Sequence, residues 1–176
     1  MRPQKVRLDL NNSNENTRFF VFSYGTVSQC AQIDDLPGKQ VSAMINMKGI
    51  KGYFKFQQDS PFSVTELTVN LTNLQSKVGP YHVHLFPVPS LRNPLSNPNY
   101  PQGPGSTHDR YEIGDLGTKH MSLAGLTEFE GVFEDYNLPL YGQNSIVGRS
   151  VVIHELNGAR YVFPIIKDKT GKCQKF

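Results

Sequence analysis

Apolar and polar residues alternate along most of the chain beyond residue 40. In VSAMINMKG every second residue from Val41 to Met47 is apolar, and GYFKFQQ follows after a short turn that contains glycine. Side chains two residues apart lie on the same face of a strand, so residues 41–58 are expected to form a β-hairpin. In SVTELTVNLTNL (63–74) the alternating set from Thr65 to Leu71 is largely apolar and the other set is mostly polar. This pattern is typical of a strand with one buried face and one face in water.

Short apolar runs separated by Gly, Pro, Asn and Asp predict the remaining strands. They are FFVFSYGTVSQC (19–30, one or two strands), YHVHLFPV (81–88), LTEFEGVFEDYNLPL (126–140), SIVGRSVVIHEL (145–156) and ARYVFPIIK (159–167). Residues 87–114 are rich in Pro, Asn, Ser and Gly, which is typical of a functional or disordered loop. No stretch of ten or more residues shows helical spacing, and we find no internal repeat. The chain is therefore expected to be all-β.

Length and composition favour one domain with an extension. The 176 residues, 38% of them apolar, suffice for a single core. Residues 1–36 are expected to be an N-terminal extension or linker, since NNSNEN (11–16) is polar, and residues 37–176 to be the domain. The net charge of +3 contains no block of like charge, which argues against nucleic-acid binding. No apolar run approaches the roughly 18 residues of a membrane span.

The cysteines and the glycosylation sequons are evidence on whether the protein is extracellular or cytoplasmic. Cys30 and Cys173 stand near opposite ends of the chain, outside any zinc-like spacing, and one long-range disulfide between them is expected. Together with N-x-S/T sequons at Asn11 and Asn70, this favours an extracellular, secreted protein. The first residues do not form a signal peptide. The chain therefore either begins inside a longer precursor or, as the alternative, is cytoplasmic.

Two histidines are the first candidates for chemistry. In YHVHLF, His82 and His84 are two residues apart, so both imidazoles leave the same face of the predicted strand. This spacing can place two nitrogens on one metal ion. The alternative is a pair of histidines on a solvated strand face.

Further motifs follow the histidine pair in a fixed order. They are RNPL (92–95), THDRYEIGDLG (107–117), SIVGRSVVIHE (145–155) and GARYV (158–162). The succession resembles the copper/zinc superoxide dismutase family, whose pattern is H-V-H, H-F-N-P, G-D-L-G, I-G-R…V-H-E and a late arginine. The resemblance covers residues 41–167. It implies a Greek-key β-sandwich or flattened barrel of about eight strands.

The resemblance also implies a site. His82, His84 and His154 match the family's copper ligands. Arg160 matches the arginine that guides the superoxide anion, and Arg149 one that holds loop structure. Water or a nearby side chain would supply a fourth copper ligand; the side-chain candidates, by proximity in sequence only, are His108, His120 and Glu112.

The family's zinc site is largely missing. Asp115 matches the aspartate zinc ligand, but Leu91 stands at the position of the histidine that bridges copper and zinc, and Glu112 replaces another zinc histidine. One surviving ligand cannot form a tetrahedral zinc site. With the short connection from His154 to Arg160, this resembles the copper-only branch, which includes repeat proteins. Glu112 and Asp115 are then expected close to the copper ligands, and the family's disulfide, at positions near Ser90 and Phe163, does not transfer.

The implied activity is copper-dependent conversion of two superoxide anions and two protons to oxygen and hydrogen peroxide, without zinc. The expected partners are superoxide and neighbouring superoxide dismutase-like repeats. A catalytically impaired structural or adhesive module is the alternative, because Leu91 cannot deliver a proton as the bridging histidine does. A zinc hydrolase is disfavoured because no carboxylate has the spacing of an H-E-x-x-H motif.

Overall fold

The computed structural model describes residues 18–24, 27–33, 38–84 and 103–169. The chain divides into two compact units, Met1–Pro37 and Gly38–Phe176. In the described part of the first unit, β1 (Arg18–Tyr24) and β2 (Val27–Ile33) pair as an antiparallel hairpin. The apolar run 19–30, predicted as one or two strands, thus contributes to two.

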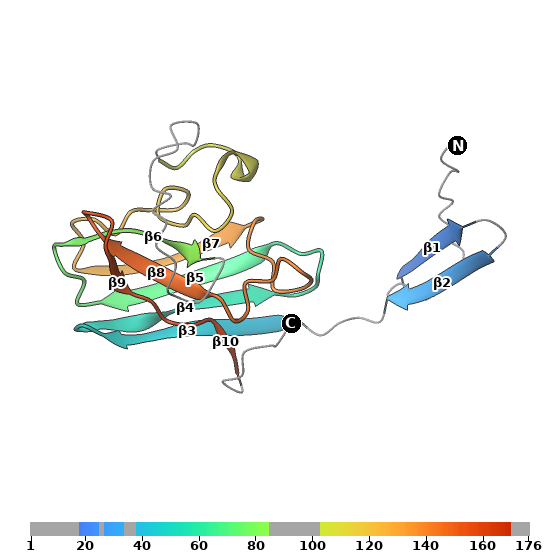
Figure 1. Cartoon of the computed structure of the whole chain (residues 1–176), viewed down its shortest axis with the longest axis horizontal. Helices are drawn as coiled ribbons and strands as arrows, with labels where there is room; N and C mark the ends of the chain where they lie inside the picture. Colours follow the sequence, from blue (N-terminus) through green and yellow to red (C-terminus); the bar gives the residue numbers. More distant parts are fainter. Residues whose placement is uncertain (1–17, 25–26, 34–37, 85–102, 170–176) are drawn as a thin grey trace. The chain divides into compact units, whose positions relative to one another are not determined.

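The described residues of the second unit form eight strands in two antiparallel sheets (Figure 1). The larger sheet has the order β10-β3-β4-β5-β7, and the smaller sheet has the order β6-β8-β9. The larger sheet comprises β3 (Lys39–Met47), β4 (Ile50–Gln58), β5 (Thr65–Thr72), β7 (Glu128–Asp135) and β10 (Lys167–Asp168). The smaller sheet comprises β6 (Val78–His84), β8 (Ser150–Glu155) and β9 (Arg160–Val162). A 3₁₀ turn, η1 (His108–Arg110), lies in the connection between β6 and β7.

The alternation of apolar residues builds the core between the two sheets. In β3 the alternate residues from Val41 to Ile45 are buried, while Met47, at the strand end beside the turn, is 39% exposed. Phe54 and Phe56 of β4 are fully buried and join one cluster with Ile153 of β8. Figure 1 shows the smaller sheet lying across the larger one. One face of each sheet is therefore buried, as the period-two pattern predicts.

The chain crosses between the sheets several times. It leaves β5 to form β6 in the smaller sheet, returns as β7 beside β5, and crosses again to β8 beside β6. These crossings place β6 and β8 in register although many residues separate them in sequence. The prediction of an all-β, Greek-key sandwich of about eight strands is confirmed.

The last predicted strand is divided in the structure. ARYVFPIIK was expected to be one strand, but β9 ends at Val162 and β10 begins at Lys167 in the other sheet. Pro164, which has no N–H to donate, lies at the break, and its carbonyl accepts a hydrogen bond from the Val151 N–H at 3.1 Å. The segment crosses from one sheet to the other at this point. Among the described residues, no helix has the length and apolar character needed to cross a bilayer.

Candidate metal centre

β6 presents His82 and His84 on one face, as the sequence predicts. Tyr81 and Val83, which alternate with them, are buried in the core. The two imidazole rings stack with centroids 4.5 Å apart and planes 10° apart. The shared face therefore follows from the two-residue period of the strand.

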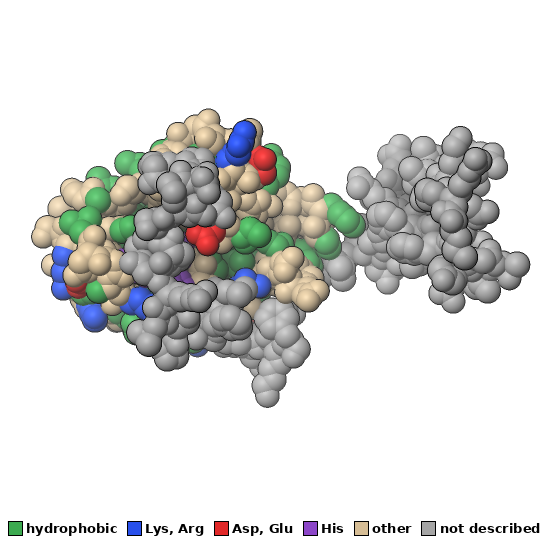
Figure 2. Space-filling view, turned by 45° about the horizontal axis from the view of Figure 1, so that its top comes forward, with side chains coloured by type: hydrophobic (Ala, Val, Ile, Leu, Met, Phe, Trp, Pro, Cys, Tyr) green, Lys and Arg blue, Asp and Glu red, His purple; other side chains and the backbone are tan. Residues whose placement is uncertain are grey.

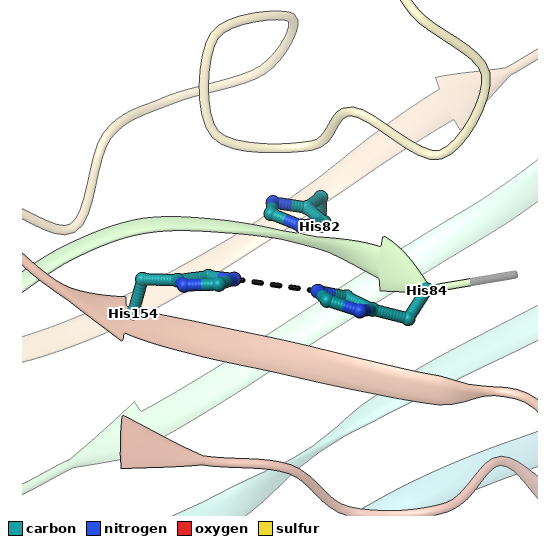
Figure 3. A group of neighbouring side chains, drawn as sticks. All are labelled: His82, His84 and His154. Carbon is teal, nitrogen blue, oxygen red and sulfur yellow. Dashed lines mark hydrogen bonds between the residues drawn. The ribbon is translucent and has the colours of Figure 1, made fainter. Parts of the chain in front are cut away.

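His154 reaches the same face from β8. In the antiparallel pairing of β6 and β8, His82 lies opposite Val152 and His84 opposite Ser150. His154 is two residues beyond Val152, so its side chain leaves β8 on the same face as the two histidines of β6. Figure 3 shows the three rings converging from the two strands. His154 is buried, with 3% of its surface exposed.

The three imidazoles are close enough to share one ion. One ligand nitrogen from each residue can be chosen so that all lie within 4.8 Å of one another. The Nε2 atoms of His84 and His154 are 3.4 Å apart (Figure 3). Two nitrogens that each lie about 2 Å from one ion are at most about 4 Å apart, so this pair already has a suitable separation.

All three histidines are held neutral. Burial, and then the repulsion from Arg160 and from His154 and His84 when these are protonated, lower the pKa of His82 to about 3. Burial, and then His154 and Arg160, lower the pKa of His84 to about 4. Burial also lowers the pKa of His154; the hydrogen bond to the Gly158 carbonyl opposes this shift, and Arg160 adds to it. At neutral pH each ring therefore keeps a lone pair that a metal can accept.

The tautomer of His154 is set by the turn that follows β8. Its Nδ1 lies 2.9 Å from the carbonyl oxygen of Gly158, which only accepts, so Nδ1 carries the proton and Nε2 keeps the lone pair. Gly158 has φ +85°, and the turn is closed by its N–H donating to the Glu155 carbonyl. Sequence reasoning missed this carbonyl. The Asn157–Gly158 pair between two apolar runs, typical of a tight hairpin turn, is the signal that points to it.

One nitrogen of the group has no partner of its own. Nε2 of His82 is buried and makes no hydrogen bond to any described residue. Leaving a buried polar atom unsatisfied is costly, and such atoms are uncommon in folded proteins. Three neutral imidazoles with an unsatisfied nitrogen fit a copper or zinc ion, both of which imidazole binds well.

Arg160 lies beside the group on β9. It is half-buried and pairs with His154 in the β8–β9 register. Its charge lowers the pKa of all three histidines, so it acts on the whole group electrostatically. Figure 2 shows a small area of histidine surface on the forward face, with Lys or Arg side chains on either side of it.

The two predicted acidic residues lie in the segment that pairs with β6. Asp115 is bridged to His82 through the backbone, and its carboxylate accepts hydrogen bonds from the backbone N–H and the hydroxyl of Thr118. Glu112 is exposed over more than a third of its surface, but partial desolvation of its carboxyl, and then the charge of Asp115, raise its pKa. Within the described ranges, the metal-capable group contains the three histidines and neither carboxylate.

Two of the side chains suggested as a fourth ligand, His108 and His120, make contacts with other residues. Nε2 of His120 lies 2.8 Å from Oδ2 of Asp135, and Nδ1 of His108 accepts from the Tyr136 N–H at 3.2 Å. Neither joins the three-histidine group of the described part of the chain. Among the described residues, therefore, no other His, Cys, Asp or Glu side chain joins the three histidines as a fourth ligand.

Three other predicted residues fall wholly or partly outside the described part of the chain. Leu91 and Cys173 lie outside the described residues, and of Cys30 only its place in β2 is described. The disulfide and the surroundings of Leu91 stay predictions.

The chain is similar to known proteins over most of its second unit. The family model for copper/zinc superoxide dismutase (SODC) matches residues 50–162, more than half of the chain. The cell surface Cu-only superoxide dismutase 5 of Candida albicans is 34% identical over an alignment of 121 residues, and the match covers 63% of this chain and 52% of that protein. The match thus spans about half the length of this relative. A Cu-Zn superoxide dismutase of Brassica juncea is 31% identical over 66% of this chain and 78% of its own length.

Solved structures agree with the sequence relatives. A mutant of Candida albicans superoxide dismutase 5 superposes with a TM-score of 0.59 at 28% identity, covering 76% of this chain and 93% of that one. The Cu(II) form of the same protein gives a TM-score of 0.56 at 27% identity, covering 75% and 92%.

Proposed function

Because the chain belongs to the copper/zinc superoxide dismutase family, we propose that it binds copper through His82, His84 and His154 and dismutates superoxide. The observation that carries this proposal is the convergence of three neutral imidazoles, one with a buried and unsatisfied nitrogen. Bound copper would supply the electron exchange, taking an electron from one superoxide and passing it to a second. The balance is two superoxide anions and two protons giving one oxygen and one hydrogen peroxide.

The chain's own residues hold the ligands and attract the anion. The Gly158 carbonyl keeps the Nε2 lone pair of His154 directed at the group. Arg160 is the proposed catalytic residue, because a positive charge beside neutral imidazoles attracts superoxide and raises its encounter rate.

We propose that copper acts without zinc. Glu112 and Leu91 stand where the family has zinc ligands, and a relative is named Cu-only. Glu112 and Asp115 are proposed to act next to the copper ligands rather than on them. Asp115 would do so through its pairing with His82.

The proposed location follows the relatives, and the proposed assembly follows the resemblance to the copper-only branch. An extracellular location is supported by the two cell-surface relatives from Candida albicans, and the alternative is cytoplasmic. A Cys30–Cys173 disulfide belongs with the extracellular proposal. Neighbouring repeats of the same fold are proposed partners.

The alternative function is a structural or adhesive module with impaired catalysis. It is favoured by one observation, the leucine at position 91 in place of the bridging histidine. Leucine has no proton to deliver, so the second half of the reaction would depend on water.

Metal content and kinetics separate the two functions. The whole chain is loaded with copper, and its metal content, Cu(II) electron paramagnetic resonance spectrum and superoxide consumption are measured. One copper per chain, with both copper and activity lost in His154→Ala and kept in the His108→Ala control, supports the enzyme. Sub-stoichiometric copper without activity supports the module. A sharp gain of activity in Leu91→His would identify the missing bridge as the limiting defect.

A further inference from the structure

A buried ion pair lies at the end of β7. The side chains of Asp135 and Lys119 are 0% and 1% exposed. Nζ of Lys119 donates to both carboxylate oxygens, at 3.0 and 2.8 Å, and Nε2 of His120 lies 2.8 Å from one of them. The Asn137 N–H donates to the other at 2.8 Å. Burial alone would raise the pKa of Asp135, but His120 and Lys119 lower it, so the carboxylate stays ionised.

Two of the residues in this group, Lys119 and His120, closely follow residues 114–117, the segment that pairs with β6 beside the histidines. The Val83 N–H donates to the Gly114 carbonyl at 2.8 Å, and the Gly117 N–H donates to the Tyr81 carbonyl at 2.9 Å. Asp115, between these two bonds, lies opposite His82. Only Thr118 separates Gly117 from Lys119, so a movement of Lys119 is passed on to the segment within two residues.

Residues 114–120 therefore connect the two sheets, and Leu116 among them belongs to the buried core. One end is bonded to β6 of the smaller sheet, and the other is bonded to Asp135 of the larger sheet. A buried ion pair adds little net stability compared with an apolar pair of the same volume. Its charge-assisted hydrogen bonds are directional, however, and so favour one position of the segment.

We propose that Asp135 is a positioning residue for the metal centre: through Lys119 and His120 it holds residues 114–117 against β6, and this sets the position of His82. The polar partners of Asp135 are Lys119, His120 and Asn137 and none of the three histidines, so it acts through the segment. The inference rests on the proposed function, because it concerns the same site.

The test compares Asp135→Asn with the Glu134→Gln control in the whole chain. Both variants exchange a carboxylate for an amide on β7, but Glu134 is exposed. Hydrogen exchange of the Val83 and Gly117 amides, measured by NMR without metal, reports on the two bonds to β6. Copper affinity by chelator competition and the Cu(II) electron paramagnetic resonance spectrum report on the site.

In Asp135→Asn we expect both amides to exchange about tenfold faster and copper to bind about tenfold more weakly, with an altered spectrum. The control should match the wild type. A double variant, Lys119→Met with Asp135→Leu, removes both charges without leaving one unpaired, so it should stay folded in urea titrations and show the same two changes.

Two outcomes overturn the inference. One is a folded Asp135→Asn with wild-type amide exchange and copper affinity. The other, which decides the question if the single variant fails to fold, is a double variant that retains wild-type values of both. If the wild-type chain binds no copper, the proposed function fails, and the amide exchange rates still show whether Asp135 holds the segment.

Discussion

The half-buried His82 of β6 predicts an acid sensitivity of the metal-free fold. His82 has an ordinary pKa of 6.5, which burial, and then the neighbouring positive charges, lower to about 3 in the folded chain. The folded state therefore disfavours the protonated ring, while the unfolded chain accepts the proton readily. The contribution of His82 is complete above pH 6.5 and is lost as the pH falls from 6.5 towards 3.

The size of the effect follows from the two pKa values. Between pH 8 and pH 5, His82 alone should lower the free energy of unfolding by about 2 kcal/mol. At pH 3 the loss should reach about 4 kcal/mol. Other groups add to the total pH dependence, so the test is a difference between two chains that share those groups.

Urea titrations of metal-free wild type and His82→Gln at pH 8 and pH 5 measure this difference. Glutamine does not titrate, so we expect the variant to lose about 2 kcal/mol less than the wild type between the two pH values. In the His108→Gln control the effect should be smaller, because burial lowers the pKa of His108 but Asp135 opposes the shift. Equal losses in wild type and His82→Gln would refute the reasoning.

Three further changes test the site, the turn and the core. Arg160→Gln should lower the rate of superoxide consumption by about tenfold at low salt and flatten the dependence of that rate on ionic strength. The exposed control Arg110→Gln should leave both unchanged, and an equal salt dependence in the two variants would contradict the guiding role of Arg160. Gly158→Ala should lower the free energy of unfolding in urea titrations by about 1 kcal/mol, because the φ angle of Gly158 is +85°. The control Gly103→Ala, where a Cβ meets nothing within 4 Å, should be close to neutral, and a neutral Gly158→Ala would mean that the turn adapts. Phe54→Ala, at a fully buried position, should cost about 3–5 kcal/mol in the same assay, and a loss below 1 kcal/mol would argue against the two-sheet core.

Local patterns were sufficient for most of the strands and for one pair of candidate ligands. The direction of a side chain from a strand depends only on its position in the two-residue period, so the alternation from Val41 to Ile45 predicted a buried face. The same rule placed His82 and His84 together. The pattern was less reliable at Pro164, where the missing N–H divides an apolar run that continues without a break in the sequence.

Residues far apart in sequence were brought together by the tertiary structure. His154 entered the predicted set only through the family resemblance, and its position beside His84 depends on the register of β6 with β8. The link from Lys119 to Asp135 had no signal in the sequence at all.

The sequence by itself thus determined which residues form strands and which face each side chain takes, because both depend on near neighbours along the chain. The tertiary structure decided which faces meet, which ring nitrogen of His154 keeps its lone pair, and which buried carboxylate holds the segment beside His82. The physical reason is that strand register and sheet crossing depend on contacts between distant segments, which the period of a single strand does not encode.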